Sequence, residues 1–365
     1  MGSVLDLTIG PVAHGGHWVA RTAEGQVVFV RHALEGERVR VRITDDSGRF
    51  LRGDAVEILE PSPERVVAPC PLAHADGCGG CDFQHVSLIE QRSLKAAVVR
   101  EQLQRLAGLD WPVECEAVPG DEEGLRWRTR MQFVDLGEGR RGLRKHRSHE
   151  VVEVEDCLIA HPDARSTPDD TAVTEHVRHR RFRVAGDGFW QVHPGAPEAL
   201  VGAVLSVLEP QPGESALDLY SGVGLFTAFL AETVGERGRV TGVEGSREAT
   251  AYARENLADL PWARSYSGRV DRWLHHNRGP VDLVVLDPPR AGAKRAVVSA
   301  VAQRRPRAVA YVACDPAALA RDVAYFADEG YELRDLRCFD LFPMTHHVEC
   351  VALLSHSTAR VPRSA

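Results

Sequence analysis

Long apolar runs are missing from this sequence of 365 residues. No stretch approaches the roughly 18 uncharged apolar residues that a membrane-spanning helix needs, and residues 1–10 lack the basic flank and apolar core of a signal peptide. Internal repeats and low-complexity segments are also lacking. With 44% hydrophobic residues, the chain can form a substantial core and two or three domains. We therefore expect a globular, cytoplasmic protein without a membrane partner.

An excess of positive charge is lacking as well. The formal net charge of -8 argues against a protein that coats nucleic acid through bulk electrostatics. Positive charge is local: residues 126–147 hold eight Lys or Arg against Asp135 and Glu138, and Arg178, Arg180, Arg181 and Arg183 follow. Such a run is often only a solvated face. In an acidic protein it is a candidate for contact with RNA phosphates.

The pattern of the chain predicts three domains, at 1–62, 63–185 and 186–365. In the first, short apolar runs at residues 4–9, 26–30, 37–43 and 53–59 alternate with glycines, which is typical of a small all-β barrel. Two prolines in residues 61–65 indicate a linker. The second domain has a mixed α+β pattern, with a helix expected over residues 88–106.

The third domain alternates buried-strand runs with helical patterns. Strands are expected at residues 216–220, 239–244, 281–287 and 308–314, with helices between them, for example at 247–257 and 316–326. Near-continuous apolar strands joined by helices predict a doubly wound, parallel sheet. The last two apolar runs, 332–342 and 348–354, predict an antiparallel hairpin. We thus expect an α/β Rossmann-like domain with a mixed, mostly parallel sheet.

A ligand-binding turn follows the first of these strands. Gly222 and Gly224 allow a ligand to approach the backbone closely, and Glu244 ends the next strand, where a carboxylate can hold the hydroxyls of a ribose. The segments that contain Asp218, Tyr220 and Glu244 resemble the S-adenosylmethionine site of Rossmann-like methyltransferases. An NAD site is the alternative, but the third glycine of the dinucleotide-binding pattern is absent.

Three reactive side chains follow or begin strands that we expect at one edge of the sheet. Asp287 precedes two prolines that fix an extended loop. Cys314 ends a strand and precedes a helix, whose dipole favours a thiolate; a small buried apolar side chain is the alternative role. Glu349 begins the returning strand of the hairpin, where burying a carboxylate without a task is costly. Because ligands bind outside the carboxyl ends of parallel strands, this edge is the expected site.

These segments resemble a known family. The motifs Leu-Asp-Pro-Pro-Arg-Ala-Gly at residues 286–292, Tyr-Val-Ala-Cys-Asp-Pro at 311–316 and His-His-Val-Glu at 346–349 are similar to the terminal motifs of the RNA uridine-C5 methyltransferases. Residues 189–192, Phe-Trp-Gln-Val, resemble a family segment whose glutamine contributes to the cofactor site, which implies that role for Gln191. The resemblance covers nearly the whole chain in order. One departure is Asp315, which stands where the family usually has asparagine.

The resemblance implies a covalent mechanism. C5 of uracil is a weak nucleophile, so the thiolate of Cys314 would add to C6 and activate C5. Glu349 would then remove the C5 proton, and Asp287 would orient a flipped-out base. A cytosine-C5 methyltransferase also uses a thiolate, but the terminal motifs favour uridine. A catalytically silent RNA-binding protein has no need for all three residues.

Four of the eight cysteines form a ligand pattern. Cys70, Cys78 and Cys81 are spaced C-x7-C-x2-C, and Cys157 lies far downstream. Without an export signal, such thiols are expected to be reduced, catalytic or metal-bound, and four thiolates suit either zinc or an iron-sulfur cluster. The segment 78–85 with a distant Asp-Cys resembles the members of the family that bind a 4Fe-4S cluster, which favours the cluster.

The N-terminal barrel resembles the TRAM domain, an OB-like RNA-binding module of the same proteins. A barrel and a cysteine cluster suit a large folded RNA, so 23S ribosomal RNA is the expected substrate, with transfer RNA as the alternative. No obligate protein partner is evident.

Overall fold

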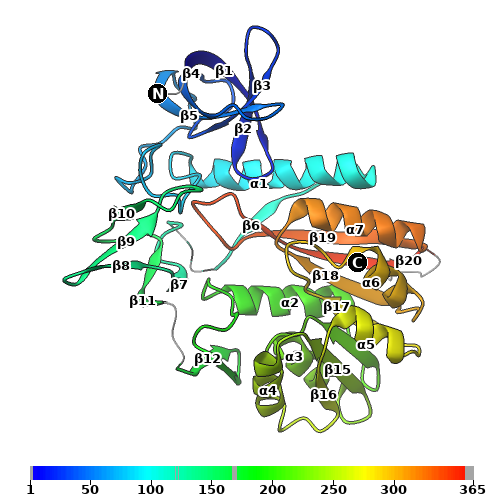
Figure 1. Ribbon diagram of the computed structural model, residues 1–365. Helices are drawn as coiled ribbons and strands as arrows, with labels where there is room; N and C mark the ends of the chain where they lie inside the picture. The colour runs from blue at the N-terminus through cyan, green and yellow to red at the C-terminus, as the bar shows by residue number, and fades with distance from the viewer. Residues whose placement is uncertain (1–2, 120, 122, 167–170, 358–365) are drawn as a thin grey trace. The chain divides into compact units, whose positions relative to one another are not determined.

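The computed structural model describes residues 3–119, 121, 123–166 and 171–357 (Figure 1). The contacts within the chain divide it into two compact units. Unit 1 comprises Met1–Val98, Pro119–Thr167 and Asp340–His347, and unit 2 comprises Val99–Val118, Pro168–Phe339 and Val348–Ala365. Each unit is therefore built from several chain segments, and the three domain boundaries expected from the sequence stay a prediction.

Unit 1 begins with a closed five-stranded barrel of order β1-β2-β3-β5-β4. Its strands are β1 (Val4–Ala13), β2 (His17–Arg21), β3 (Val27–Arg31), β4 (Arg38–Asp45) and β5 (Leu51–Glu60). In β4, Val39, Val41 and Ile43 point into the barrel core while the alternating arginines face outward. This confirms the predicted barrel, although β2 gave no clear alternation in the sequence.

A buried ion pair connects the barrel to the linker that follows it. Glu37 is fully buried, and its carboxylate accepts hydrogen bonds from the backbone of Leu34 at 2.8 Å and of Ser62 at 3.1 Å. The Nε of Arg65 donates to the same carboxylate at 2.6 Å. Because all these partners satisfy the buried charge, the linker is held in one conformation against the barrel.

The rest of unit 1 is an α+β segment. Its elements are most of α1 (Leu88–Gln102), β7 (Arg128–Met131), β8 (Val134–Gly137), β9 (Arg140–Arg144), β10 (Val151–Glu153) and β11 (Ala160–Ser166). The strands form a sheet of order β10-β9-β8 and a separate pair, β11-β7. The boundary between the units passes through α1.

Unit 2 contains an eight-stranded sheet of order β16-β15-β14-β17-β18-β20-β19-β6. The strands are β6 (Cys115–Ala117), β14 (Ser215–Leu219), β15 (Arg239–Glu244), β16 (Ala263–Ser267), β17 (Leu283–Leu286), β18 (Ala308–Ala313), β19 (Tyr331–Asp340) and β20 (Glu349–His356). The strands from β14 to β18 pair in parallel, and β20 runs antiparallel to both β18 and β19. The predicted Rossmann-like fold, with a mixed and mostly parallel sheet, is confirmed.

Helices connect these strands (Figure 1). They are α2 (Ala196–Leu208), α3 (Leu225–Val234), α4 (Arg247–Asn256), α5 (Val270–His276), α6 (Lys294–Ala302) and α7 (Pro316–Asp328), and unit 2 also holds the short helix η1 (Leu103–Ala107) and the hairpin β12 (Val173–Val177) and β13 (Arg180–Val184). None of the helices in the described part of the chain has the length and apolar character needed to cross a membrane. Parallel strands end at one edge of the sheet, so the residues after β14, β15, β17 and β18 lie along that edge.

Candidate active site

The turn after β14 has an unusual backbone. Tyr220 has a φ of 67°, and Gly222 and Gly224 have φ values of 54° and 88°. A tyrosine rarely adopts this left-handed conformation, which persists only where the surroundings hold it. Here the backbone N–H of Tyr220 donates to the carbonyl of Val243 at 2.9 Å. The turn therefore presents its backbone in a fixed conformation at the start of α3.

Two carboxylates flank this turn. Glu244 accepts hydrogen bonds from the backbone N–H of Gly222 at 2.9 Å and of Ser246 at 2.7 Å. Asp218 is fully buried, and one of its oxygens accepts from the hydroxyl of Thr227 at 2.6 Å. Its other oxygen, Oδ1, has no hydrogen-bond partner among the described residues. A buried, unsatisfied acceptor of this kind needs a donor from a ligand.

Negative charge accumulates around the turn. Burial raises the pKa of Asp218 to about 6, and the charge of Glu244 adds to the rise. Burial also raises the pKa of Asp287 to about 7, with contributions from the charges of Asp218 and Glu244. A cationic ligand would relieve this repulsion, and the sulfonium and ammonium groups of S-adenosylmethionine are such cations. The residues therefore fit the cofactor that the sequence predicts.

The remaining predicted cofactor residue, Gln191, lies on the segment between β13 and α2. Its side chain is half-buried. The adjoining Trp190 packs against Phe182, with ring centroids 5.9 Å apart, and so anchors this segment. The cofactor role of Gln191 stays a prediction.

The register of β18 and β20 brings together the thiol and a carboxylate. Ala313 is paired with Cys350 across the two antiparallel strands. Cys314 directly follows β18, and Glu349 is the first residue of β20, so the two face each other at the end of this strand pair. Cys314 is half-buried and Glu349 is 4% exposed.

Burial dominates the ionisation of this pair. It raises the pKa of the Cys314 thiol to about 12, and the charge of Glu349 adds to the rise, while Arg290 opposes it. Burial likewise raises the pKa of Glu349 well above its ordinary value, with a further rise from Asp287 and an opposing effect of Arg290. The predicted reactive residues therefore share one electrostatic environment. Arg290, which sequence reasoning did not single out, supplies its positive charge.

The expected effect of the helix on the thiol is not the dominant one. The helix α7 does begin directly after Cys314, and the side chain of Asp315 accepts from the backbone N–H of Ala318 at 2.8 Å as its N-cap. Asparagine and aspartate cap helices equally well, so this departure from the family motif preserves the cap. Burial and nearby carboxylates outweigh the helix dipole, however, and favour the protonated thiol in the ligand-free site.

Sequence reasoning also missed Asp322 of α7. This residue is fully buried, and its Oδ2 accepts from the backbone of Ala293 at 2.7 Å and from the hydroxyl of Tyr311 at 2.6 Å. Gly292 lies so close that an added Cβ would come within 2.6 Å of the same oxygen. Asp322 therefore holds the end of the loop that carries Asp287 and Arg290. Its signal in the sequence is an aspartate on the apolar face of a helix.

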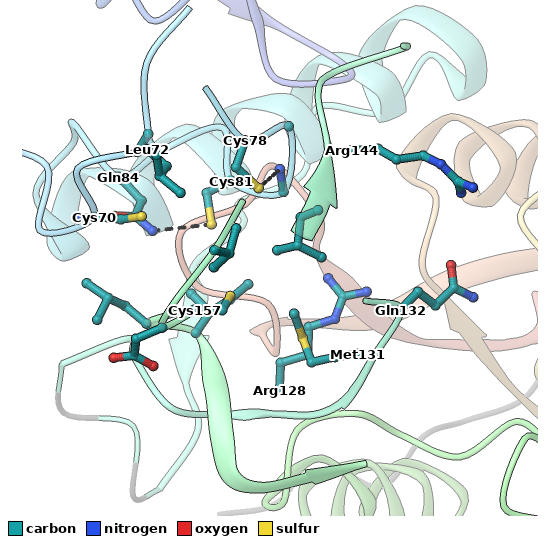
Figure 2. A pocket seen from close by; sticks show the side chains of 18 residues that line it. Cys70, Leu72, Cys78, Cys81, Gln84, Arg128, Met131, Gln132, Arg144 and Cys157 are labelled. Atoms are coloured by element: carbon teal, nitrogen blue, oxygen red, sulfur yellow. Dashed lines mark hydrogen bonds between the residues drawn. The ribbon is translucent and has the colours of Figure 1, made fainter. Parts of the chain in front are cut away.

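The four predicted ligand cysteines line one cavity of about 230 Å³ in unit 1. Figure 2 shows the sulfur atoms of Cys70, Cys78, Cys81 and Cys157 around this cavity. Gln84 donates to the sulfur of Cys81 at 3.3 Å, and burial raises the pKa of the Cys78 and Cys157 thiols. In the residues that the structure describes, no three His, Cys, Asp or Glu side chains are arranged to hold a single metal ion. The four thiols converge, but the structure does not itself show an iron-sulfur domain.

The predicted basic segment, residues 126–147, carries less unbalanced positive charge than its sequence indicates. Arg126 pairs with Asp156 at 2.5 Å, and Lys145 pairs with Glu150 at 2.7 Å. In unit 2, Arg180 pairs with both Glu232 and Asp259. These partners balance part of the local charge, so contact with RNA phosphates stays a prediction for the segment.

Comparison with known proteins identifies the parts of the chain. The TRAM domain profile matches residues 1–56, and the profile of tRNA (Uracil-5-)-methyltransferase matches residues 274–357. The profile of protein-L-isoaspartate(D-aspartate) O-methyltransferase matches residues 191–271, the stretch that holds the cofactor turn. The last match reflects the shared cofactor-binding half of the fold.

Relatives extend over the whole chain. An uncharacterized RNA methyltransferase of Streptomyces avermitilis is 45% identical over 97% of this chain and 98% of its own. The 23S rRNA (uracil(1939)-C(5))-methyltransferase RlmD of Acinetobacter baylyi is 30% identical over 94% of this chain and 92% of its own. The crystal structure of a Pyrococcus abyssi tRNA (uracil-54, C5)-methyltransferase with S-adenosyl-L-homocysteine has a TM-score of 0.71 at 20% identity, and covers 96% of this chain and 100% of that one.

The fold and the site define an S-adenosylmethionine-dependent methyltransferase that acts on RNA. Within that class, the chain belongs to the RNA uracil-C5 methyltransferase family and is an RNA (uracil-5-)-methyltransferase.

Asp287 should make stability depend on pH. In the unfolded chain an aspartate loses its proton near pH 4, whereas the folded chain keeps this proton up to about pH 7. Stability is therefore lost as the pH rises between these values. The Asp287→Asn variant should melt at a higher temperature than the wild type at pH 8, with a smaller difference at pH 5, in cofactor-free protein. Equal differences at both pH values would contradict this assignment.

Proposed function

We propose that the chain methylates C5 of a uridine in 23S ribosomal RNA through a covalent adduct between Cys314 and C6 of the base. The observation that carries this proposal is the meeting of a thiol, a buried carboxyl group and an arginine at the end of β18. The similarity to the 23S rRNA enzyme of Acinetobacter baylyi over nearly the whole chain supports the choice of RNA.

The first step is addition of the sulfur of Cys314 to C6. The thiol proton passes to solvent before the S–C6 bond forms, and the charge of Arg290 assists because it lowers the pKa of this thiol. As the S–C6 bond forms, the C5–C6 electron pair moves onto C5 and the O4 carbonyl, which makes C5 nucleophilic. S-adenosylmethionine supplies an electrophilic methyl group for C5. Asp218, Tyr220, Gly222, Gly224 and Glu244 at the turn after β14, with Asp287 after β17 and Gln191 before α2, would hold that cofactor.

The second step is elimination. Glu349 takes the proton from C5, the C5–C6 double bond forms again, and the thiolate of Cys314 leaves C6. A carboxylate whose pKa is raised above its ordinary value is a stronger base than an ordinary one. Asp287, with a pKa of about 7, can donate or accept a hydrogen bond and so orient the uracil ring.

Substitutions of Glu349 and Cys314 separate the two steps. The Glu349→Gln variant should add to RNA and methylate it but release product at least about a hundredfold more slowly, the lower range for loss of a general base. A covalent protein-RNA band should then accumulate on denaturing gels.

The Cys314→Ala variant should bind cofactor yet form no adduct with RNA. RNA with 5-fluorouridine should trap only proteins that keep this thiol. Full turnover by Cys314→Ala would exclude the covalent mechanism.

We also propose that Cys70, Cys78, Cys81 and Cys157 hold a 4Fe-4S cluster. A single zinc ion draws its ligands to one centre, whereas a cubane cluster binds each cysteine through a different iron. The four cysteines line one cavity of about 230 Å³, which offers room for the larger group. Methyl transfer requires no electron flow, so we assign the cluster a structural or RNA-positioning role.

Metal analysis distinguishes the cluster from zinc. Protein purified without oxygen should be brown and contain about four irons per chain, and the colour should be lost in the Cys81→Ser variant. Cys115→Ser is the matched control, because Cys115 lies in unit 2, outside the cavity. A colourless protein with one zinc per chain would overturn the cluster.

The choice of RNA is tested with labelled cofactor. Purified 23S ribosomal RNA and transfer RNA are offered separately, and the modified nucleoside is identified by mass spectrometry. We expect 5-methyluridine in the ribosomal RNA. Label that enters only transfer RNA would assign the chain to the alternative substrate, and 5-methylcytidine would exclude the uridine reaction.

A further inference from the structure

The loop Leu341–His347 ends two residues before Glu349, and it belongs to unit 1. The segment that follows Cys81 holds this loop. The backbone N–H groups of Asp82 and Phe83 both donate to the carbonyl of Met344 at 3.0 Å. The carboxylate of Asp82 lies 2.6 Å from Nδ1 of His346 and also accepts from its backbone N–H at 3.3 Å.

The barrel and α1 contact the same loop. Gly16, in the turn between β1 and β2, has a φ of 74°, and an added Cβ would come within 2.8 Å of the Cβ of His346. From α1, the side chain of Gln91 accepts from the backbone N–H of Met344 at 2.8 Å. Lys95 binds the start of the loop through Asp340 at 2.5 Å and the carbonyl of Phe342 at 3.0 Å.

These contacts use groups that are costly to bury. Gln91, Lys95 and Asp82 are all at most 9% exposed. Each has a hydrogen-bond partner in the loop, which is the arrangement that makes a buried polar network rigid. The loop is thus restrained at its start, at Met344 and at His346, only three residues before Glu349.

We infer that Asp82 and His346 are positioning residues for Glu349. Asp82 follows Cys81 directly, so the cysteine segment restrains the loop that precedes β20 in the chain. A base misplaced by about 1 Å can lose a large part of its rate. The effect should therefore fall on elimination, the step that uses Glu349, and not on addition by Cys314. This inference rests on the proposed function.

The test follows release of product from a preformed adduct with uridine-containing RNA. Asp82→Asn should release product about tenfold more slowly than the wild type, while its cofactor affinity and trapping by 5-fluorouridine stay unchanged. His346→Ala should behave in the same way. His346→Asn should restore release, because its amide can donate to Asp82 from nearly the position of Nδ1.

Asp76→Asn is the matched control, since Asp76 belongs to the same segment but pairs with Arg42 of the barrel at 2.6 Å. Iron is measured in every variant. If Asp82→Asn loses iron, its slower release no longer tests the positioning role by itself. The two His346 variants then test that role, because His346 lies outside the cysteine segment. Wild-type release in His346→Ala, or equal slowing in His346→Ala and His346→Asn, overturns the positioning role alone. A wild-type protein that never forms an adduct overturns the proposed function, and this inference with it.

Discussion

The accumulation of buried carboxyl groups at one edge of the sheet is the constraint on which the rest of the site depends. Asp218 lies in β14, Asp287 directly follows β17 and Glu349 begins β20, and burial raises the pKa of each carboxyl group. Such groups repel one another and favour protonation, which destabilises the ligand-free protein. Strand pairing in the parallel sheet supplies the stability that keeps them together.

This constraint accounts for the polarity of the site. A cationic cofactor is attracted to the acidic side, and Arg290 balances the carboxyl groups beside the thiol. The protonated thiol in the ligand-free state also protects a reactive group from oxidation, because the thiolate is the form that reacts. The reactivity of the Cys314 thiol then depends on whether cofactor and RNA occupy the site.

Much of the fold could be predicted because its signals are local. The apolar strands β14, β17 and β18, the capped helix α7 and the final hairpin all have distinct patterns in the sequence. The short strands β6 and β16 could not be predicted, since their polar residues read as loop and only their neighbours make them strands. The cysteines and Glu349 could be named from spacing and from a carboxylate in an apolar run. The direction in which the pKa of Cys314 shifts could not be predicted, because it depends on burial and on charges from other elements.

The same distinction applies to Asp322 and Asp82. Each is an ordinary aspartate in its own segment, and its importance lies in a partner far along the chain, at Ala293 or at His346. Side chains that position others leave little trace in local sequence patterns. Their identification requires the tertiary structure.

The antiparallel pairing of β20 with β18 limits how the preceding loop can vary. Successive residues of a strand face opposite sides of the sheet, so a shift of one residue would turn Glu349 away and bring its neighbour Cys350 into its place. The length of the loop Leu341–His347 is therefore constrained by this register, in addition to the contacts of its side chains. Insertions in this family should accumulate at the opposite edge of the sheet, where the turns carry no reacting group.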